Sequence, residues 1–96
     1  MVASKLLTEK RDEILRLATK CGARNVRVFG SFARGDEKPD SDIDFLVDLD
    51  DDRSLMDVGG LLMDLQELLG RPVDVVTQRG LRERIRATVL KEAVDL

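Results

Sequence analysis

Two aspartates, Asp42 and Asp44, stand at the start of an apolar run that alternates in the manner of a β-strand, from Ile43 to Leu49. Successive side chains of a strand point to opposite faces, so both carboxylates are expected on one face and the odd-numbered apolar side chains in a core. Neighbouring carboxylates repel each other unless a cation lies between them. Oxygen ligands suit a hard ion such as Mg²⁺, which proteins bind with one or two carboxylates and with substrate phosphates. The pair therefore predicts a metal-dependent site for phosphate chemistry.

A Gly-Ser pair, Gly30 and Ser31, ends the preceding apolar run, and ten residues separate it from Asp42. Gly30 has no Cβ and lets the backbone approach a phosphate closely. Ser31 offers a hydroxyl and a backbone N–H at the start of an expected helical turn, where an anion is favoured. Alone, such a pair more often marks only a tight turn, and no Walker loop is present. Together with the two aspartates, the pair predicts a phosphate-binding site.

A third carboxylate, Asp74, lies within a run of valines, where burial would require a partner. It either pairs with Arg27 or Arg71, or lies beside Asp42 and Asp44 as a third ligand. Three carboxylates can hold two metal ions about 3.5–4 Å apart, which stabilises the attacking and leaving oxygens of a phosphoryl displacement. In that arrangement the third carboxylate would also orient the acceptor hydroxyl and help to deprotonate it.

Three residues between these motifs have expected supporting roles. Arg34 either reaches a triphosphate or braces the loop by pairing with Asp36, Asp40 or Asp42. Gly35 is expected to supply a positive φ at the turn, and Ser41 to hydrogen-bond the neighbouring backbone and set the entry of the next strand. Farther along the same strand face, Asp48 is expected at a solvated strand end.

The hydrophobic pattern predicts seven elements in the order α-β-(short α)-β-α-β-α. Their expected ranges are 8–20, 25–29, 31–35, 42–49, 54–69, 72–77 and 81–94, with Thr8 and Gly22 as caps of the first helix. Gly59 and Gly60 fall inside the fifth element and indicate either a kink or a close packing contact. The connection between the last two strands is long and helical, as parallel pairing requires, whereas the short connection between the first two suits antiparallel neighbours. The fold class is therefore α/β (α+β), a short mixed sheet flanked by helices, with the Gly-Ser pair and the aspartates at one edge.

Length and composition limit the classes of function. Ninety-six residues predict a single domain, 1–96, and charge near the N-terminus argues against a signal peptide, so a cytoplasmic location is expected. The chain has no histidine, which excludes Ser-His-Asp hydrolysis, Cys-His catalysis and histidine-ligated zinc. Cys21 is the only cysteine, so no internal disulfide can form. The net charge of −3 and the scarcity of aromatic residues argue against direct nucleic-acid binding.

The stretch GSFARGDEKPDSDIDFLV resembles the signature of the DNA polymerase β-type nucleotidyltransferase superfamily, Gly-Ser-x10-Asp-x-Asp followed by an aspartate on a later strand. Five positions match the signature itself: Gly30, Ser31, Asp42, Asp44 and Asp74. The accompanying Arg34, Gly35 and Ser41 match as well. The stretches LLMDLQELLGRPVDVVT and RIRATVLKEAVDL resemble the minimal nucleotidyltransferases, or MntA-like proteins, so the resemblance covers nearly the whole chain.

The resemblance implies a polymerase β-like fold and transfer of a nucleoside monophosphate from a nucleoside triphosphate to a hydroxyl, with release of pyrophosphate. It implies that Asp42, Asp44 and Asp74 are catalytic and bind Mg²⁺, with two ions expected. Gly30, Ser31, Arg34 and Ser41 would bind the nucleotide, with ATP as the substrate. The implied partner is a HEPN-domain toxin, adenylylated on a tyrosine, with this chain as the antitoxin of a type VII-like toxin-antitoxin pair.

Two other functions stay open at the level of sequence. One is a non-catalytic antitoxin that masks its partner, and the other is a small-molecule nucleotidyltransferase of the aminoglycoside type. The chain leaves no room for a primer-binding or drug-binding domain beside one small sheet and its helices. It also contains no tyrosine, so a tyrosine acceptor must belong to another molecule.

Overall fold

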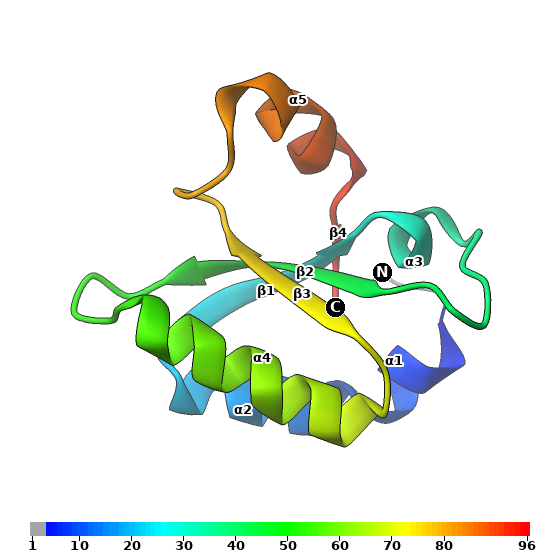
Figure 1. The fold of residues 1–96 in the computed structure, drawn as a ribbon, viewed down its shortest axis with the longest axis horizontal. Helices are drawn as coiled ribbons and strands as arrows, with labels where there is room; N and C mark the ends of the chain where they lie inside the picture. The colour runs from blue at the N-terminus through cyan, green and yellow to red at the C-terminus, as the bar shows by residue number, and fades with distance from the viewer. Residues whose placement is uncertain (1–3) are drawn as a thin grey trace.

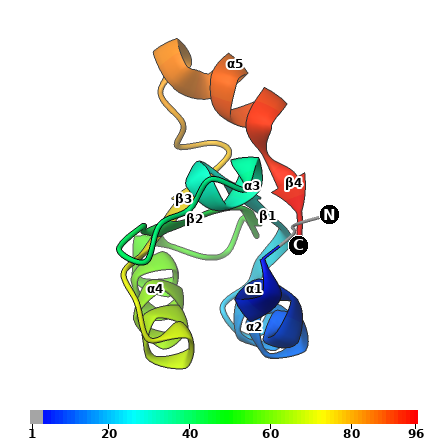
Figure 2. The same cartoon turned by 90° about the vertical axis from the view of Figure 1, so that its right-hand side faces the viewer.

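A four-stranded mixed sheet forms the centre of the fold, with its strands in the order β3-β2-β1-β4 (Figure 1). The computed structural model describes residues 4–96, so the first three residues of the expected 1–96 domain lie outside the described part. The strands are β1 (Ala23–Phe29), β2 (Ile43–Leu49), β3 (Val73–Thr77) and β4 (Val94–Asp95). The helices are α1 (Lys5–Glu9), α2 (Arg11–Lys20), α3 (Ser31–Arg34), α4 (Leu55–Leu69) and α5 (Glu83–Glu92). Helices α1, α2 and α4 lie on one side of the sheet, and α3 and α5 lie on the other (Figure 2).

Strand pairing follows the expected pattern for the three longer strands. Strands β1 and β2 are antiparallel, and β2 and β3 are parallel with α4 as the crossover between them. The first strand begins two residues earlier than predicted. Its register with β2 shifts between Arg24 and Arg27, where Asn25 adopts a positive φ of 53°. This irregularity is a β-bulge. Because it interrupts the alternation of apolar and polar side chains, the sequence pattern does not reveal that the strand begins at Ala23.

The C-terminal segment differs from the prediction of one closing helix over 81–94. Helix α5 ends at Glu92, and Val94 and Asp95 then pair with β1 as a short edge strand. Leu96 is buried, its N–H donates to Val26 O, and its carbonyl oxygen accepts from Arg11 Nε. Val94 continues the helical spacing of apolar residues. Pairing with the free edge of β1 and burial of Leu96 nevertheless stabilise an extended conformation for these last residues.

The N-terminal segment also differs from the single helix predicted over 8–20. Two helices occupy it, and Ser4, rather than Thr8, caps the first, because Ser4 Oγ accepts from the Leu7 N–H. Thr8 lies inside α1 and donates its hydroxyl to Ser4 O. Gly22 adopts the expected left-handed conformation just beyond α2, with φ 75°.

Helix α4 runs unbroken through its two central glycines. Ser54 and Asp57 form a capping box at its start, and Gly70, in the left-handed conformation, ends it. A Cβ placed on Gly59 or on Gly60 would meet no other atom within 4 Å. The interpretation of a close packing contact at these glycines is therefore wrong for the described residues.

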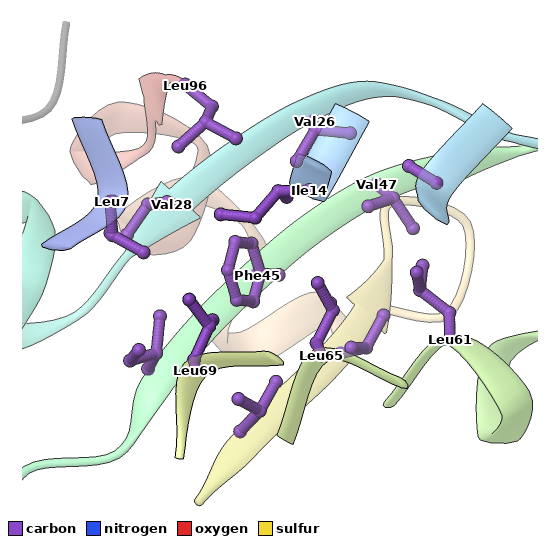
Figure 3. Close-up of a cluster of buried hydrophobic side chains, with 14 of the residues drawn as sticks. Leu7, Ile14, Val26, Val28, Phe45, Val47, Leu61, Leu65, Leu69 and Leu96 are labelled. Atoms are coloured by element: carbon purple, nitrogen blue, oxygen red, sulfur yellow. The ribbon is translucent and has the colours of Figure 1, made fainter. Parts of the chain in front are cut away.

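The hydrophobic core lies between the sheet and helices α1, α2 and α4. Figure 3 shows Phe45 at the centre of this cluster, among Ile14, Leu65 and Leu69. The other face of the sheet carries a much smaller buried cluster, Leu46, Leu81 and Val89, under α5. None of the helices within residues 4–96 is long and apolar enough to span a membrane. The main core thus fixes one face of β2 and leaves the face that carries Asp44 largely available for a site.

Candidate active site

The three aspartates are brought together by the register of β2 and β3. Asp44 pairs directly with Asp74 on the parallel neighbour and with Phe29 on the antiparallel neighbour. Asp42 lies just before β2, two residues from Asp44. Asp44 is half-buried, whereas Asp42 and Asp74 are exposed. The predicted proximity of Asp74 to the Asp-x-Asp pair is confirmed, and because Asp74 is exposed it needs no buried partner.

Asp44 is the electrostatic centre of this group. Burial raises its pKa to about 6, and the charges of Asp74, Asp42 and Glu92 contribute in that order, while Arg34 opposes the rise. An ionised Asp44 therefore lies in an excess of negative charge that a cation would relieve. The donor set consists of carboxylate oxygens, which fits Mg²⁺. Among residues 4–96, no three acidic side chains lie close enough together to form a ready-made metal site.

Gly30 joins the end of β1 to α3 in a conformation that favours glycine. Its φ of 74° and ψ of −152° lie in a region that side chains with a Cβ rarely adopt. A Cβ added to Gly30 would also overlap Asp44 Oδ2. The Asp44 carboxylate therefore lies close to this glycine, and the expected approach of a phosphate to it stays a prediction. Ser31 follows as the first residue of α3 and holds the turn, because its carbonyl oxygen accepts from the N–H groups of Gly35 and Asp36.

Arg34, at the end of α3, has two carboxylate partners. Its Nε donates to Asp36 at 3.2 Å, which confirms one of the predicted loop pairings. Its Nη1 donates to Glu92 Oε1, and Glu92 Oε2 accepts the Gly30 N–H at 3.0 Å. The hydrogen bond to Glu92, and then the one to Asp36, raises the pKa of Arg34. Sequence reasoning missed Glu92, since a glutamate near the end of an amphipathic helix carries no local signal of such a role.

The loop before Asp42 is held by Ser41 and by Arg71. Ser41 Oγ accepts from the Lys38 N–H at 2.8 Å, which confirms its predicted contact with the neighbouring backbone. The Arg71 guanidinium donates to the carbonyl oxygens of Lys38, Pro39 and Ser41. It also lies over the Phe32 ring, 4.9 Å from the centroid. Arg71 therefore connects the loop, α3 and the start of β3, a role that the sequence did not reveal.

Neither arginine considered as a partner of Asp74 pairs with it. Arg71 is committed to the loop carbonyls, and Arg27 donates to Asp48 at 3.2 Å and to Gln78 at 2.9 Å. Asp48 is thus part of an ion pair instead of a solvated strand end. The ion-pair interpretation of Asp74 is wrong, and its carboxylate is left beside Asp44.

The aspartates lie on an open surface. Asp42 and Asp74 are exposed, and all three aspartates lie outside the recess at the opposite end of β2 that Asp50, Arg53 and Arg79 help to line. An open site can accept a group carried on a large molecule.

Comparison with known proteins identifies the family. The sequence profile of the nucleotidyltransferase domain family matches residues 8–96. The chain belongs to this family. This nucleotidyltransferase is 42% identical over 89 residues to the protein adenylyltransferase MntA of Thermococcus cleftensis, covering 93% of this chain and 87% of that protein. A protein of Methanocaldococcus jannaschii with the provisional name protein adenylyltransferase is 37% identical over 90 residues, covering 94% and 97% of the two chains. The predicted resemblance to minimal nucleotidyltransferases, and the prediction of an enzyme, are confirmed.

Solved structures confirm the fold. One that is provisionally described as a minimal nucleotidyltransferase matches with a TM-score of 0.86 and 45% identity, covering 98% of both chains. Another, described as a toxin-antitoxin with AMP-PNP, matches with a TM-score of 0.76, covering 88% of this chain and 69% of that one. Its sequence is 23% identical, so this second likeness concerns the fold alone. The polymerase β-like nucleotidyltransferase fold predicted from the signature is the observed one.

Proposed function

We propose that this nucleotidyltransferase transfers AMP from ATP to a tyrosine hydroxyl of a partner HEPN-domain toxin, in an Mg²⁺-dependent reaction. It would thereby act as the antitoxin of a type VII-like toxin-antitoxin pair. The single observation that carries the enzymatic part is the direct pairing of Asp44 with Asp74, beside the turn that contains Gly30. This is the arrangement that holding a cation and a triphosphate together requires.

Each functional residue has a proposed role. Asp42, Asp44 and Asp74 hold Mg²⁺, with two ions proposed. Gly30, Ser31, Arg34 and Ser41 bind and orient the triphosphate. Bound Mg²⁺ would neutralise triphosphate charge and stabilise the attacking and leaving oxygens.

The proposed transfer is a single displacement at the α-phosphorus. The hydroxyl oxygen of the acceptor forms a bond to this phosphorus, and the bond from the phosphorus to the oxygen bridging the α- and β-phosphates breaks. Pyrophosphate leaves with that bridging oxygen, and the hydroxyl proton passes to the Asp74 carboxylate. Asp74 suits this role because it is the exposed member of the paired Asp44–Asp74 couple.

Three observations support a protein acceptor. The aspartates lie on an open face, the chain contains no tyrosine of its own, and relatives at 37% and 42% identity carry the name protein adenylyltransferase. The solved neighbours described as toxin-antitoxin complexes, one of them with AMP-PNP, support a toxin as the acceptor and an adenine nucleotide as the donor.

The decisive experiment incubates the protein with the product of an adjacent HEPN-domain gene, ATP and Mg²⁺. Intact-mass spectrometry should show the toxin gaining AMP, and peptide mapping should locate it on a tyrosine. Asp42→Asn and Asp44→Asn should abolish the transfer. Asp40→Asn is the matched control, because Asp40 is exposed in the loop just before the site and should leave the transfer intact.

Two outcomes separate this proposal from its alternatives. Neutralisation of the toxin in cells by an Asp42→Asn/Asp44→Asn double variant would indicate a binding antitoxin that masks its partner. AMP transfer to free aminoglycosides, with none to the toxin, would indicate a small-molecule enzyme.

A further inference from the structure

Glu92 links the C-terminal helix to the turn that follows β1. It is the last residue of α5, and its side chain is 21% exposed. One carboxylate oxygen accepts the Gly30 N–H at 3.0 Å, and the other accepts from Arg34 Nη1 at 2.5 Å. A single anionic group therefore bridges a backbone donor and a guanidinium across 62 and 58 residues of sequence, respectively.

These two donors are the ones that the proposed function assigns to the triphosphate. A backbone N–H has one hydrogen, so Gly30 cannot donate fully to Glu92 and to a phosphate oxygen at once. The Arg34 guanidinium has more donors, but its Nε is already directed at Asp36. Charge-assisted hydrogen bonds of this kind are among the stronger ones in proteins, so the carboxylate is a real competitor for both groups.

We propose that Glu92 competes with the triphosphate for the Gly30 N–H and the Arg34 guanidinium, and that the triphosphate must displace it in order to bind. This inference rests on the proposed function, because it takes Gly30 and Arg34 as ligands of the triphosphate. A carboxylate and a phosphate oxygen also repel each other, so Glu92 cannot remain in place as a neighbour of the bound triphosphate.

The fold allows this release with little rearrangement. The Glu92 side chain already reaches solvent, so a rotation about its own bonds removes it from the site. Helix α5 rests on the sheet through a small cluster that includes Leu46 and Val89, and β4 pairs with only two residues of β1. The release needs no shift of the backbone, because Leu96, four residues farther along, stays anchored in the main core while the Glu92 side chain turns outward.

The consequence is a selective barrier to binding. The apparent dissociation constant of a ligand rises by the inverse of the fraction of protein in which the position is open. If that fraction is about one in ten, release of Glu92 changes triphosphate affinity about tenfold. A ligand without phosphates, such as adenosine, does not need the position and is not affected.

The test measures binding of three probes, ATP with Mg²⁺, inorganic tripolyphosphate with Mg²⁺, and adenosine, to the full chain and to Glu92→Gln. Glutamine keeps the size of the side chain and loses its charge. We expect ATP and tripolyphosphate to bind about tenfold more tightly to the variant, and adenosine to bind equally to both proteins. Glu83→Gln is the matched control, since it removes the same charge from the same helix at a side chain that is 96% exposed.

The inference is overturned if Glu92→Gln binds ATP no more tightly than Glu83→Gln does, or if adenosine gains as much as tripolyphosphate. A purely structural role of Glu92 predicts the opposite sign, weaker ATP binding together with a lower melting temperature. Should Glu92→Gln fail to fold, Glu92→Asp tests the same point, because the shorter acid keeps the charge but cannot bridge both donors. Hydrogen exchange at the Gly30 amide gives a second readout, since it should speed up in either variant.

Failure of this inference and failure of the proposed function give different results. A wild-type protein that binds ATP and adenylylates its partner, with unchanged affinity in Glu92→Gln, overturns only the role of Glu92. A wild-type protein that binds neither ATP nor tripolyphosphate at any concentration tested contradicts both.

Discussion

Asp44 and Asp74 are direct neighbours in the parallel pairing of β2 and β3, and neither Arg27 nor Arg71 neutralises them. Two adjacent carboxylates repel each other, and Arg34 offsets this only in part at Asp44, so the pair lowers the stability of the chain unless it binds a cation. The pairing therefore connects the stability of the metal-free chain to the chemistry of its site.

The first prediction concerns the pH dependence of stability in the metal-free protein. The pKa of Asp44 is raised from 3.8 to about 6 in the folded state, so the folded chain binds more protons than the unfolded chain between these values. Stability is therefore expected to fall as pH rises from about 4 to 6 and to stay low above that window. Asp44→Asn removes this effect, and at pH 7 in EDTA it should be more stable by about 1 kcal/mol, allowing for solvent screening of a half-exposed group.

Urea unfolding of both proteins at several pH values measures this difference. The two curves should converge near pH 3.5, and added Mg²⁺ should raise the midpoint of the wild type alone. A variant that is less stable than the wild type at pH 7 without metal would contradict the like-charge interpretation of the site.

The second prediction separates catalysis from binding at Asp74. Asp74→Asn keeps the size of an exposed side chain and removes the proposed proton acceptor. AMP transfer should fall by about 10²–10⁴-fold, the usual contribution of a positioned general base. ATP binding, measured by calorimetry, should change far less, because Asp42 and Asp44 remain. Equal losses in transfer and in ATP affinity would make Asp74 a binding residue only.

The site was predictable from sequence where it depends on local pattern and strand connection. Alternation places Asp42 and Asp44, and the helical crossover forces β3 to lie parallel to β2, which brings Asp74 to Asp44. The contacts of Glu92 and Arg71 were not predictable, because their partners lie 30 residues or more away in the sequence and are brought near only by the tertiary fold. Strand β4 was missed for a similar reason: Val94 continues a helical spacing, and only the free edge of β1 decides that it becomes a strand.

The third prediction tests the space above Gly30. Gly30→Ala forces a side chain into an unfavourable backbone region and against Asp44 Oδ2, so it should destabilise the protein by about 3 kcal/mol. Gly35→Ala is the matched control, since Gly35 has a similar φ of 78° but no atom within 4 Å of an added Cβ; its cost should be about 1 kcal/mol. Thermal unfolding measures both. In an Asp44→Ala background the penalty at Gly30 should shrink, and an unchanged penalty would show that the overlap with Asp44 is unimportant.

The last prediction concerns Arg71, which ties the loop before Asp42 to α3. Arg71→Lys keeps the charge but cannot reproduce three carbonyl contacts and the stacking on Phe32 from one planar group. The chain should lose about 1–2 kcal/mol of stability, and AMP transfer should fall severalfold because Asp42 follows the loosened loop. Arg79→Lys, at a side chain that is 89% exposed, should change neither quantity. If Arg71→Lys loses stability but transfers AMP at the normal rate at saturating ATP, the loop supports the fold and does not position Asp42. That result would contradict a role of Arg71 in the active site.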